Sequence, residues 1–363
     1  MSKSDCILKL KTLLAGVNRK VKLVSANKQE IFIFGAGNTA KLHAKCFEVE
    51  NITPVAFLDN DSKKQGTAFI SGREIMSPSS VRGRKDILVL ICSAQPDVQK
   101  AISEQLEDLG LSFLTVDEYV FSKRANEILK CAELLDDERS AEIYADVIES
   151  RLTGRFPAAK FIDRDQYFAL PQFSMVMDKE VFVDCGAFVG DTIENYLFSH
   201  DGTFGKIIAF EPDTVNYRAM EYRVERLNRE WALSPDKIQT VKAGVGLKST
   251  VGTIEQHNRL GSMIAEGTAA AGDSIKIYSL DDFFAEQKID FLKADIESFE
   301  YDMLRGAEAV IRRDLPKIAV CIYHNASDMY HILLWLAGLN LDYKFSVRHH
   351  SSRYCETVLY AYH

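Results

Sequence analysis

The sequence predicts an α/β protein with two units in succession, each built on a mostly parallel sheet. Short apolar runs alternate with stretches of helical periodicity in both halves of the chain, which is the pattern of strand–helix–strand crossovers. The leading strand of each half runs into a glycine-containing turn, at Gly35 and at Gly186. The last two apolar runs have no helix between them, which predicts a closing hairpin.

The first unit begins with a helix over residues 1–27, where apolar residues recur at helical spacing. Continuous apolar runs follow, as expected for strands buried on both faces of a sheet. The predicted strands are 31–34, 54–58, 87–92 and 113–116, with helices over 41–49 and 96–109. Residues 123–152 contain neither glycine nor proline, so we expect connecting helices there. We place the domains at 1–122, a helical linker at 123–157, and 158–363.

The second unit has the same alternation with more strands. Its strand-like runs are 180–183, 206–210, 238–241, 289–293, 317–323, 343–347 and 357–362. Its helical stretches are 191–198, 214–229, 299–313 and 326–337. Only the loop 348–354 separates the last two strands, so we expect them to pair antiparallel.

Composition and charge exclude several classes of function. The 363 residues are enough for two hydrophobic cores. A net charge of -8 disfavours nucleic acid and anionic membranes as partners, since both attract clustered Lys and Arg. Seven cysteines without a Cys-x-x-Cys pair favour buried thiols in a reducing compartment. No apolar run is long enough to cross a bilayer, so we expect a cytoplasmic protein.

The turn after the strand 180–183 carries the pattern Asp-x-Gly-x-x-x-Gly and leads into a helix. Glycines let the backbone turn tightly and approach a ligand closely. Free amides at the helix start suit a carboxylate, and the acid suits an ammonium group better than a pyrophosphate. An ordinary strand-to-helix turn is the alternative. The candidate ligand residues are Asp184, Gly186, Phe188, Gly190, Asp191 and Thr192.

A second signal is Glu211-Pro212-Asp213 at the end of the strand 206–210. An acid at the end of the next strand, about twenty residues downstream of a glycine turn, accepts hydrogen bonds from ribose hydroxyls. We assign that role to Glu211. Pro212 ends the strand, and Asp213 either joins the site or only caps the following helix.

Together these stretches resemble the FkbM family of methyltransferases over roughly residues 160–363. The resemblance implies that the second of the two Rossmann-like units is a seven-stranded class I methyltransferase sheet ending in an antiparallel hairpin. It also implies S-adenosylmethionine as cofactor and O-methylation of a sugar, glycoconjugate or natural product, as in polysaccharide biosynthesis. Members commonly have glycine where this chain has Ser298. The matching stretches are Val183–Thr192, Ala209–Asp213, Tyr278–Asp282, Ile289–Glu300 and Leu304–Ala307.

Methyl transfer requires the protein to position an acceptor and remove its proton. The strand ends before Asp295 and His324 should lie side by side at the carboxyl edge of the sheet, where ligands bind. We predict His324 as general base, because an imidazole titrates near neutral pH. Asp295 and Glu297 would hold the acceptor or orient the base. The alternatives are a divalent metal on these three residues, or acids that are merely solvated or cap a helix.

The remaining candidates are less specific. We also assign three residues to the cofactor: Asp295, Gly244 and Tyr167. The aromatic side chains of Tyr167 and Phe168 either close over the cofactor or belong to the core. The hairpin loop carries positive and imidazole side chains that either bind an anionic or sugar substrate or are simply solvated: Arg348, His349, His350 and Arg353.

The first unit has its own fingerprint, with Gly35 and Gly37 after a buried strand and Asp59 ending the next one. It resembles the nucleotide-binding domains of polysaccharide-biosynthesis proteins, including sugar-nucleotide dehydratases. It therefore either binds a nucleotide or NAD(P), or is only a scaffold. For the whole chain, the alternatives to a methyltransferase are a nicotinamide-dependent sugar-nucleotide enzyme and a non-catalytic nucleotide-binding module. The acceptor is left open, and a homo-oligomer is compatible with the sequence.

Overall fold

The structure is a computed structural model that describes residues 2–257, 261–266 and 274–363. The chain divides into two compact units. The first comprises Met1–Ile162 with two later segments, Tyr323–Leu334 and Ser351–Thr357. The second comprises Asp163–Ile322, Trp335–His350 and Val358–His363.

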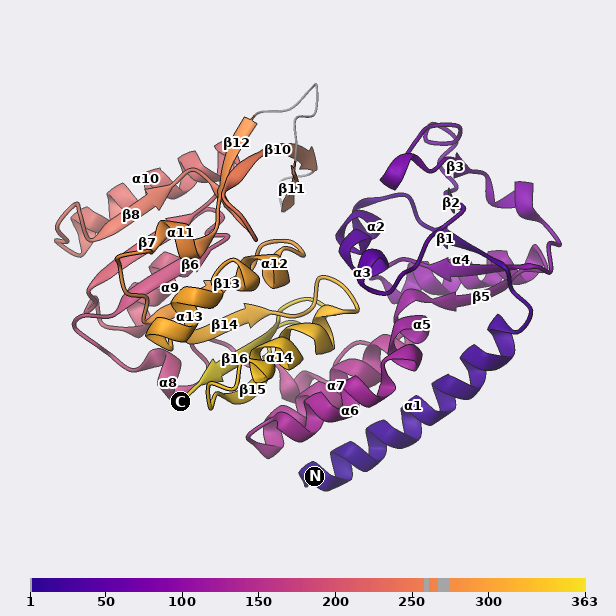
Figure 1. Cartoon of the computed structure of the whole chain (residues 1–363), viewed down its shortest axis with the longest axis horizontal. Helices are drawn as coiled ribbons and strands as arrows, with labels where there is room; N and C mark the ends of the chain where they lie inside the picture. The colour runs from indigo at the N-terminus through magenta and orange to yellow at the C-terminus, as the bar shows by residue number, and fades with distance from the viewer. Residues whose placement is uncertain (1, 258–260, 267–273) are drawn as a thin grey trace. The chain divides into compact units, whose positions relative to one another are not determined.

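The first unit contains a five-stranded sheet in the order β3-β2-β1-β4-β5 (Figure 1), and every neighbouring pair is parallel. Strand β4, which lies between β1 and β5, is Ile-Leu-Val-Leu-Ile with all five residues buried, as expected for a strand covered on both faces. The predicted parallel sheet is confirmed, and β3 is a short strand that the sequence did not indicate. The strands are β1 Glu30–Phe34, β2 Ala56–Leu58, β3 Ile75–Met76, β4 Ile87–Ile91 and β5 Ser112–Thr115.

Helices complete the first unit, and α1 packs along α5, α6 and α7 (Figure 1). Local sequence sets their ends. Thr115 and Glu118 form a reciprocal capping box at the start of α5, and Gly154 ends α7 in the left-handed conformation. The helices are α1 Lys3–Ser25, α2 Asn38–Leu42, α3 Ala44–Val49, α4 Pro96–Asp108, α5 Val116–Lys123, α6 Ala125–Leu134 and α7 Glu138–Thr153.

The second unit is built on a seven-stranded sheet in the order β15-β16-β14-β13-β6-β7-β8. Strands β8, β7, β6, β13 and β14 are parallel, and β16 is inserted antiparallel to β14. All seven strands coincide with predicted apolar runs, and the closing hairpin is confirmed. They are β6 Val181–Cys185, β7 Lys206–Phe210, β8 Ile238–Val241, β13 Phe291–Ala294, β14 Lys317–Cys321, β15 Lys344–His349 and β16 Thr357–Tyr362.

Helices connect these strands, and α14 runs from the segment grouped with the first unit into the second. The predicted helix 299–313 is two helices, α12 and α13, which meet at Gly306 and Ala307. The helices are α8 Pro171–Ser174, α9 Asp191–Ser199, α10 Thr214–Glu230, α11 Leu280–Phe283, α12 Glu300–Arg305, α13 Glu308–Asp314 and α14 Asp328–Gly338.

A separate four-stranded sheet, in the order β11-β10-β12-β9, lies between β8 and β13 in the sequence and was not predicted. In β12 every second side chain is buried, as in a strand with one solvated face. Its strands are β9 Gly244–Val245, β10 Thr250–His257, β11 Gly261–Glu266 and β12 Ser274–Tyr278.

Within the described residues, no helix has both the length and the apolar character of a membrane span.

Candidate functional site

The glycine turn after β6 is shaped by backbone that only glycine fits. Gly186 has a φ of 81°, and a Cβ built there would lie 1.9 Å from the carbonyl oxygen of Asp295. Gly190 has a φ of 80° and precedes α9. The amides of Gly186 and Ala187 donate to the Phe210 carbonyl at 3.0 and 2.9 Å, which anchors the turn to the end of β7. The turn is therefore closely built against β7 and the end of β13.

A buried ion pair lies beneath this turn. Asp184 on β6 is 0% exposed, and its Oδ1 lies 2.9 Å from Nζ of Lys293, the residue opposite it on β13. The same ammonium donates to the Gly186 carbonyl at 2.8 Å and lies over the Tyr167 ring, 4.9 Å from its centroid. Burial by itself lowers the pKa of Lys293, but the carboxylates of Asp184 and Asp295 raise it overall. The ammonium that Asp184 contacts is therefore Lys293, a residue the sequence analysis did not single out.

Glu211 directly follows β7 and is 6% exposed. One carboxylate oxygen accepts the Phe188 amide at 2.9 Å, and the other accepts the Asp213 amide at 2.8 Å. Phe188 itself has a φ of 48°, which turns its amide toward the carboxylate. Burial raises the pKa of Glu211 to about 7, although these two amide hydrogen bonds oppose the rise. The predicted ribose acid is thus held rigidly against the glycine turn.

The other predicted residues near Glu211 have mainly structural contacts. Asp213 caps α10, since its Oδ1 accepts the amides of Val215 and Asn216 at 2.8 and 3.0 Å. Pro212 separates β7 from that cap. Asp191 is exposed and Thr192 is buried in the first turn of α9. Gly244 is a buried residue of β9, where it pairs with Ile277 of β12.

Asp295 directly follows β13 and is half-buried. The Tyr167 hydroxyl donates to its Oδ2 at 2.8 Å and lies 3.7 Å from the Cys321 sulfur. Tyr167 is 6% exposed with a φ of 70°, and its amide donates to the Tyr360 hydroxyl at 3.1 Å. The structure therefore brings Tyr167, Asp295 and the Asp184–Lys293 pair together behind the glycine turn.

The loop after Asp295 contains two consecutive residues of positive φ, Glu297 at 55° and Ser298 at 74°. The left-handed region favours glycine, which explains the glycine that the FkbM resemblance leads one to expect at Ser298. Glu297 is half-buried. Glu300 is 0% exposed, and its Oε1 accepts the Ile296 amide at 2.7 Å, so this acid closes the loop as a capping group.

His324 lies in the segment Tyr323–Leu334, which is grouped with the first unit. It is 6% exposed, and its ring lies 4.1 Å from that of Tyr323, centroid to centroid. The Tyr323 carbonyl accepts a hydrogen bond from Arg151 at 3.2 Å, and Arg151 also pairs with buried Asp117 at 2.8 Å. The segment around His324 is thus held by α5 and α7.

The expectation that four basic residues lie in the hairpin loop is wrong for two of them. Arg348 and His349 belong to β15 and are 9% and 0% exposed. The His350 ring is bonded to the Asp163 carbonyl at 3.1 Å and to the Tyr360 hydroxyl at 3.1 Å, and burial lowers its pKa. Arg353 alone is an exposed loop residue.

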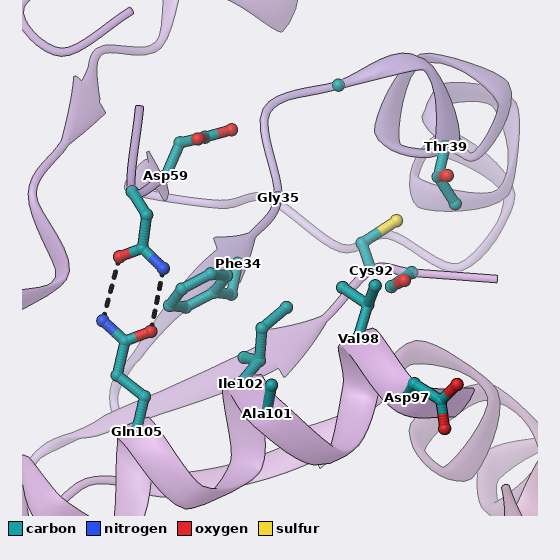
Figure 2. Close-up of a pocket in the computed structure, with 13 residues that line it drawn as sticks. Phe34, Gly35, Thr39, Asp59, Cys92, Asp97, Val98, Ala101, Ile102 and Gln105 are labelled. Carbon is teal, nitrogen blue, oxygen red and sulfur yellow. Dashed lines mark hydrogen bonds between the residues drawn. The ribbon is translucent and has the colours of Figure 1, made fainter. Parts of the chain in front are cut away.

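In the first unit, Gly35, Gly37 and Asp59 all line one pocket of about 500 Å³ (Figure 2). The pocket lies at the carboxyl ends of β1, β2 and β4, and α4 forms a further wall. The three residues that the sequence fingerprint selects are therefore brought together.

Comparison with known proteins gives two matches to family models. Residues 184–345 match the model described as Methyltransferase FkbM domain, and residues 27–114 match the model described as C2185-like, N-terminal. No curated protein matches the chain.

Among solved structures, Methyltransferase FkbM from Methylobacillus flagellatus KT is similar over 99% of each chain, with 19% identity and a TM-score of 0.59. A putative rRNA methylase from Clostridium thermocellum is 11% identical over 55% of this chain and 95% of its own, with a TM-score of 0.36. A putative methyltransferase from Streptococcus mutans in complex with SAH is 12% identical over 52% of this chain and 92% of its own, with a TM-score of 0.32. The first of these shares the fold of the chain.

The glycine turn, the acid after β7 and the sheet that ends in an antiparallel hairpin all lie within or beside the matched region. The match of residues 184–345 to the FkbM methyltransferase domain supports a methyltransferase.

Proposed function

We propose that the enzyme uses S-adenosylmethionine to methylate a hydroxyl of a sugar, glycoconjugate or other natural product. The observation that carries this proposal is Glu211, a buried carboxylate held by two backbone amides beside the glycine turn. An ionised acid in that position suits a pair of ribose hydroxyls. A side chain at Gly186 would collide with the Asp295 carbonyl, so glycine at this position lets the turn pack closely against the residue that follows β13.

The cofactor supplies a sulfonium methyl that is already activated for displacement. The protein then has to align the acceptor hydroxyl and remove its proton. β13 and β14 are parallel neighbours, Asp295 follows β13 directly, and His324 stands three residues after the end of β14. We assign His324 as the general base and Asp295, oriented by the Tyr167 hydroxyl, as the residue that holds the acceptor. Glu297 is the alternative holder.

Binding of S-adenosylhomocysteine, measured by calorimetry, tests the cofactor assignment. Glu211→Ala should weaken binding by about 10- to 150-fold, because hydrogen bonds to a charged group contribute about 1.5–3 kcal/mol. Glu230→Ala is the matched control, since Glu230 is an exposed acid at the end of α10. Absence of binding by the unaltered protein would refute the proposal.

Turnover on a panel of sugar and phenol hydroxyls tests the base. His324→Ala should lose turnover and keep S-adenosylhomocysteine binding, whereas His331→Ala on α14 should keep both. A divalent metal at Asp295 and Glu297 remains the alternative route to an acidic acceptor. It predicts that EDTA abolishes turnover and that added Mg²⁺ or Mn²⁺ restores it.

The setting we propose is cytoplasmic polysaccharide biosynthesis, with a small molecule or glycan as acceptor rather than nucleic acid or a membrane. The net charge of -8 favours such an acceptor over a polyanion. Six of the seven cysteines are buried free thiols, as expected in a reducing compartment. A glycan-derived acceptor panel that yields no product, with turnover on RNA instead, would contradict this setting.

A nicotinamide-dependent enzyme is the weaker candidate. Tyr119 and Lys123 on α5 do show the Tyr-x-x-x-Lys spacing of one class of dehydrogenases. Neither is among the residues that line the pocket of the first unit, and Nζ of Lys123 pairs with Glu50 at 3.2 Å. Their contacts therefore favour a structural role.

A further inference from the structure

The first unit has a pocket that methyl transfer does not use. Its floor is formed where β1, β2 and β4 end, at Gly35, Asp59 and Cys92. In the order β3-β2-β1-β4-β5, the chain moves from β1 to one side of the sheet and later returns to the other side with β4. Open parallel sheets bind ligands in the crevice at such a switch point. A volume of about 500 Å³ lies within the range of small-molecule sites.

Asp59 gives this pocket an ionised carboxylate whose position is fixed by hydrogen bonds. Its Oδ2 accepts the Ala36 amide at 3.0 Å and Nζ of Lys64 at 3.1 Å, and its Oδ1 accepts the Asp61 amide at 2.9 Å. Burial opposes ionisation, but these hydrogen bonds hold the pKa of Asp59 below its ordinary value. A carboxylate has about four acceptor positions, so one remains for a hydroxyl donor. Lys64 is itself committed to Asp59 and to the Ala36 carbonyl, which accepts from its Nζ at 3.1 Å.

The opposite wall of the pocket carries apolar side chains. Val98, Ala101 and Ile102 project from α4 toward the glycine turn in Figure 2. Val98 is 40% exposed, so part of its side chain is accessible to a ligand. Asn60 and Gln105 lie across one end and exchange two hydrogen bonds of 2.9 Å. An apolar wall with a polar end suits a heterocyclic base.

The two glycines of the turn differ in what they do. Gly35 has a φ of 114°, and a Cβ there would lie 2.8 Å from the Cys92 carbonyl oxygen, so the fold requires glycine. Gly37 has an extended backbone, with a φ of -127°, and a Cβ there would meet no atom within 4 Å. The fold does not need glycine at 37. Its absent side chain leaves open the space in which a ligand would lie.

We propose that this pocket binds a nucleoside 5′-diphosphate whose ribose keeps both hydroxyl groups. The ribose is held by Asp59, the base lies against Val98 and Ile102, and the diphosphate passes the backbone at Gly37. A 2′-phosphate would be repelled by the Asp59 carboxylate, and Lys64 already donates to Asp59 and to the Ala36 carbonyl. The site therefore selects ADP, UDP or NAD⁺ against NADP⁺. It goes beyond methyl transfer and does not depend on it.

Calorimetry on the full chain with ADP, UDP, NAD⁺ and NADP⁺ as separate titrants tests the proposal and identifies the base. At least one of the first three should bind with a Kd below 1 mM, and NADP⁺ should bind at least tenfold more weakly than NAD⁺, a difference expected when an acid takes the ribose. Gly37→Val and Asp59→Asn should each weaken binding at least tenfold. Gly16→Val is the matched control, because a Cβ at Gly16 on α1 also meets no atom within 4 Å.

S-adenosylhomocysteine binding should stay unchanged in Gly37→Val, which separates this site from the methyltransferase site and shows that the variant is folded. The proposal is overturned if none of ADP, UDP and NAD⁺ binds the unaltered protein. It is also overturned if Gly37→Val binds as tightly as the unaltered protein. Equal binding of NAD⁺ and NADP⁺ would overturn the role of Asp59.

Discussion

Lys293→Met should destabilise the second unit and loosen the glycine turn. The change leaves the Asp184 carboxylate, 0% exposed, without its counter-charge and removes the donor to the Gly186 carbonyl. Breaking a buried ion pair by removing one partner costs about 3–5 kcal/mol. If the free energy of unfolding falls by about 2 kcal/mol per M urea, the midpoint of urea unfolding should fall by about 1.5–2.5 M. Binding of S-adenosylhomocysteine should weaken as well, because the turn loses an anchor.

Lys317→Met separates the effect on the turn from general destabilisation. Lys317 is a half-buried lysine on the same sheet, with Nζ 2.7 Å from buried Glu180, but it stands at the beginning of β14. Both variants should lower the urea midpoint, and only Lys293→Met should weaken ligand binding under conditions where both are folded. The double variant Asp184→Leu/Lys293→Met should recover most of the lost stability. If the two single costs at Asp184 and Lys293 simply add to within about 0.5 kcal/mol, the two residues do not act as a pair and the reasoning is wrong.

Three further predictions concern the same unit. Burial raises the pKa of Glu211 to about 7, and hydroxyl donors favour its ionised form. S-adenosylhomocysteine affinity should therefore fall about tenfold from pH 8 to pH 6, as the ionised fraction of Glu211 drops from about 0.9 to about 0.1. Calorimetry should show a weaker pH dependence in Glu211→Gln, and the same pH dependence in that variant would contradict the prediction. Ser298→Gly should raise the free energy of unfolding by about 0.5–1 kcal/mol, since the φ of 74° disfavours any side chain; Ser298→Ala should bring no gain in urea titrations, and equal gains would exclude backbone relief. Tyr167→Phe should lower kcat at least tenfold with little change in ligand Kd, because the ring over Lys293 is kept while the hydrogen bond to Asp295 is lost; an unchanged kcat would argue against Asp295 as the acceptor's holder.

Much of the fold could be predicted because the central strands of parallel sheets are continuous apolar runs. All five residues of β4 are apolar and buried, and β13 departs from such a run only at buried Lys293, so both sequences differ plainly from those of the helices. The four-stranded sheet was missed because its strands are of mixed composition rather than continuous apolar runs. The burial alternation in β12, Ser-Ile-Lys-Ile-Tyr, was a readable signal of period two.

The candidate site was predictable where a residue's role follows from its place at a strand end, as for Glu211. It was not predictable where the role depends on the residue opposite. Asp184 and Lys293 are more than one hundred positions apart, and only the register of β6 against β13 makes them partners. A lysine inside an apolar strand is nevertheless a signal, because a buried ammonium needs an acid beside it.

The segment Tyr323–Leu334 limits where recombination could exchange one half of the chain for another. It lies within the region that matches the methyltransferase family model, yet it packs with the first unit. Two side chains of α7 donate hydrogen bonds to the backbone of this segment. The Tyr144 hydroxyl donates to the Met329 carbonyl at 2.8 Å, and Arg151 donates to the Tyr323 carbonyl. If the first unit were replaced by an unrelated domain, these two carbonyls would lose their hydrogen-bond donors. Recombination at the boundary seen in the sequence is thus disfavoured, and residues 125–153 and 323–334 should evolve as one piece.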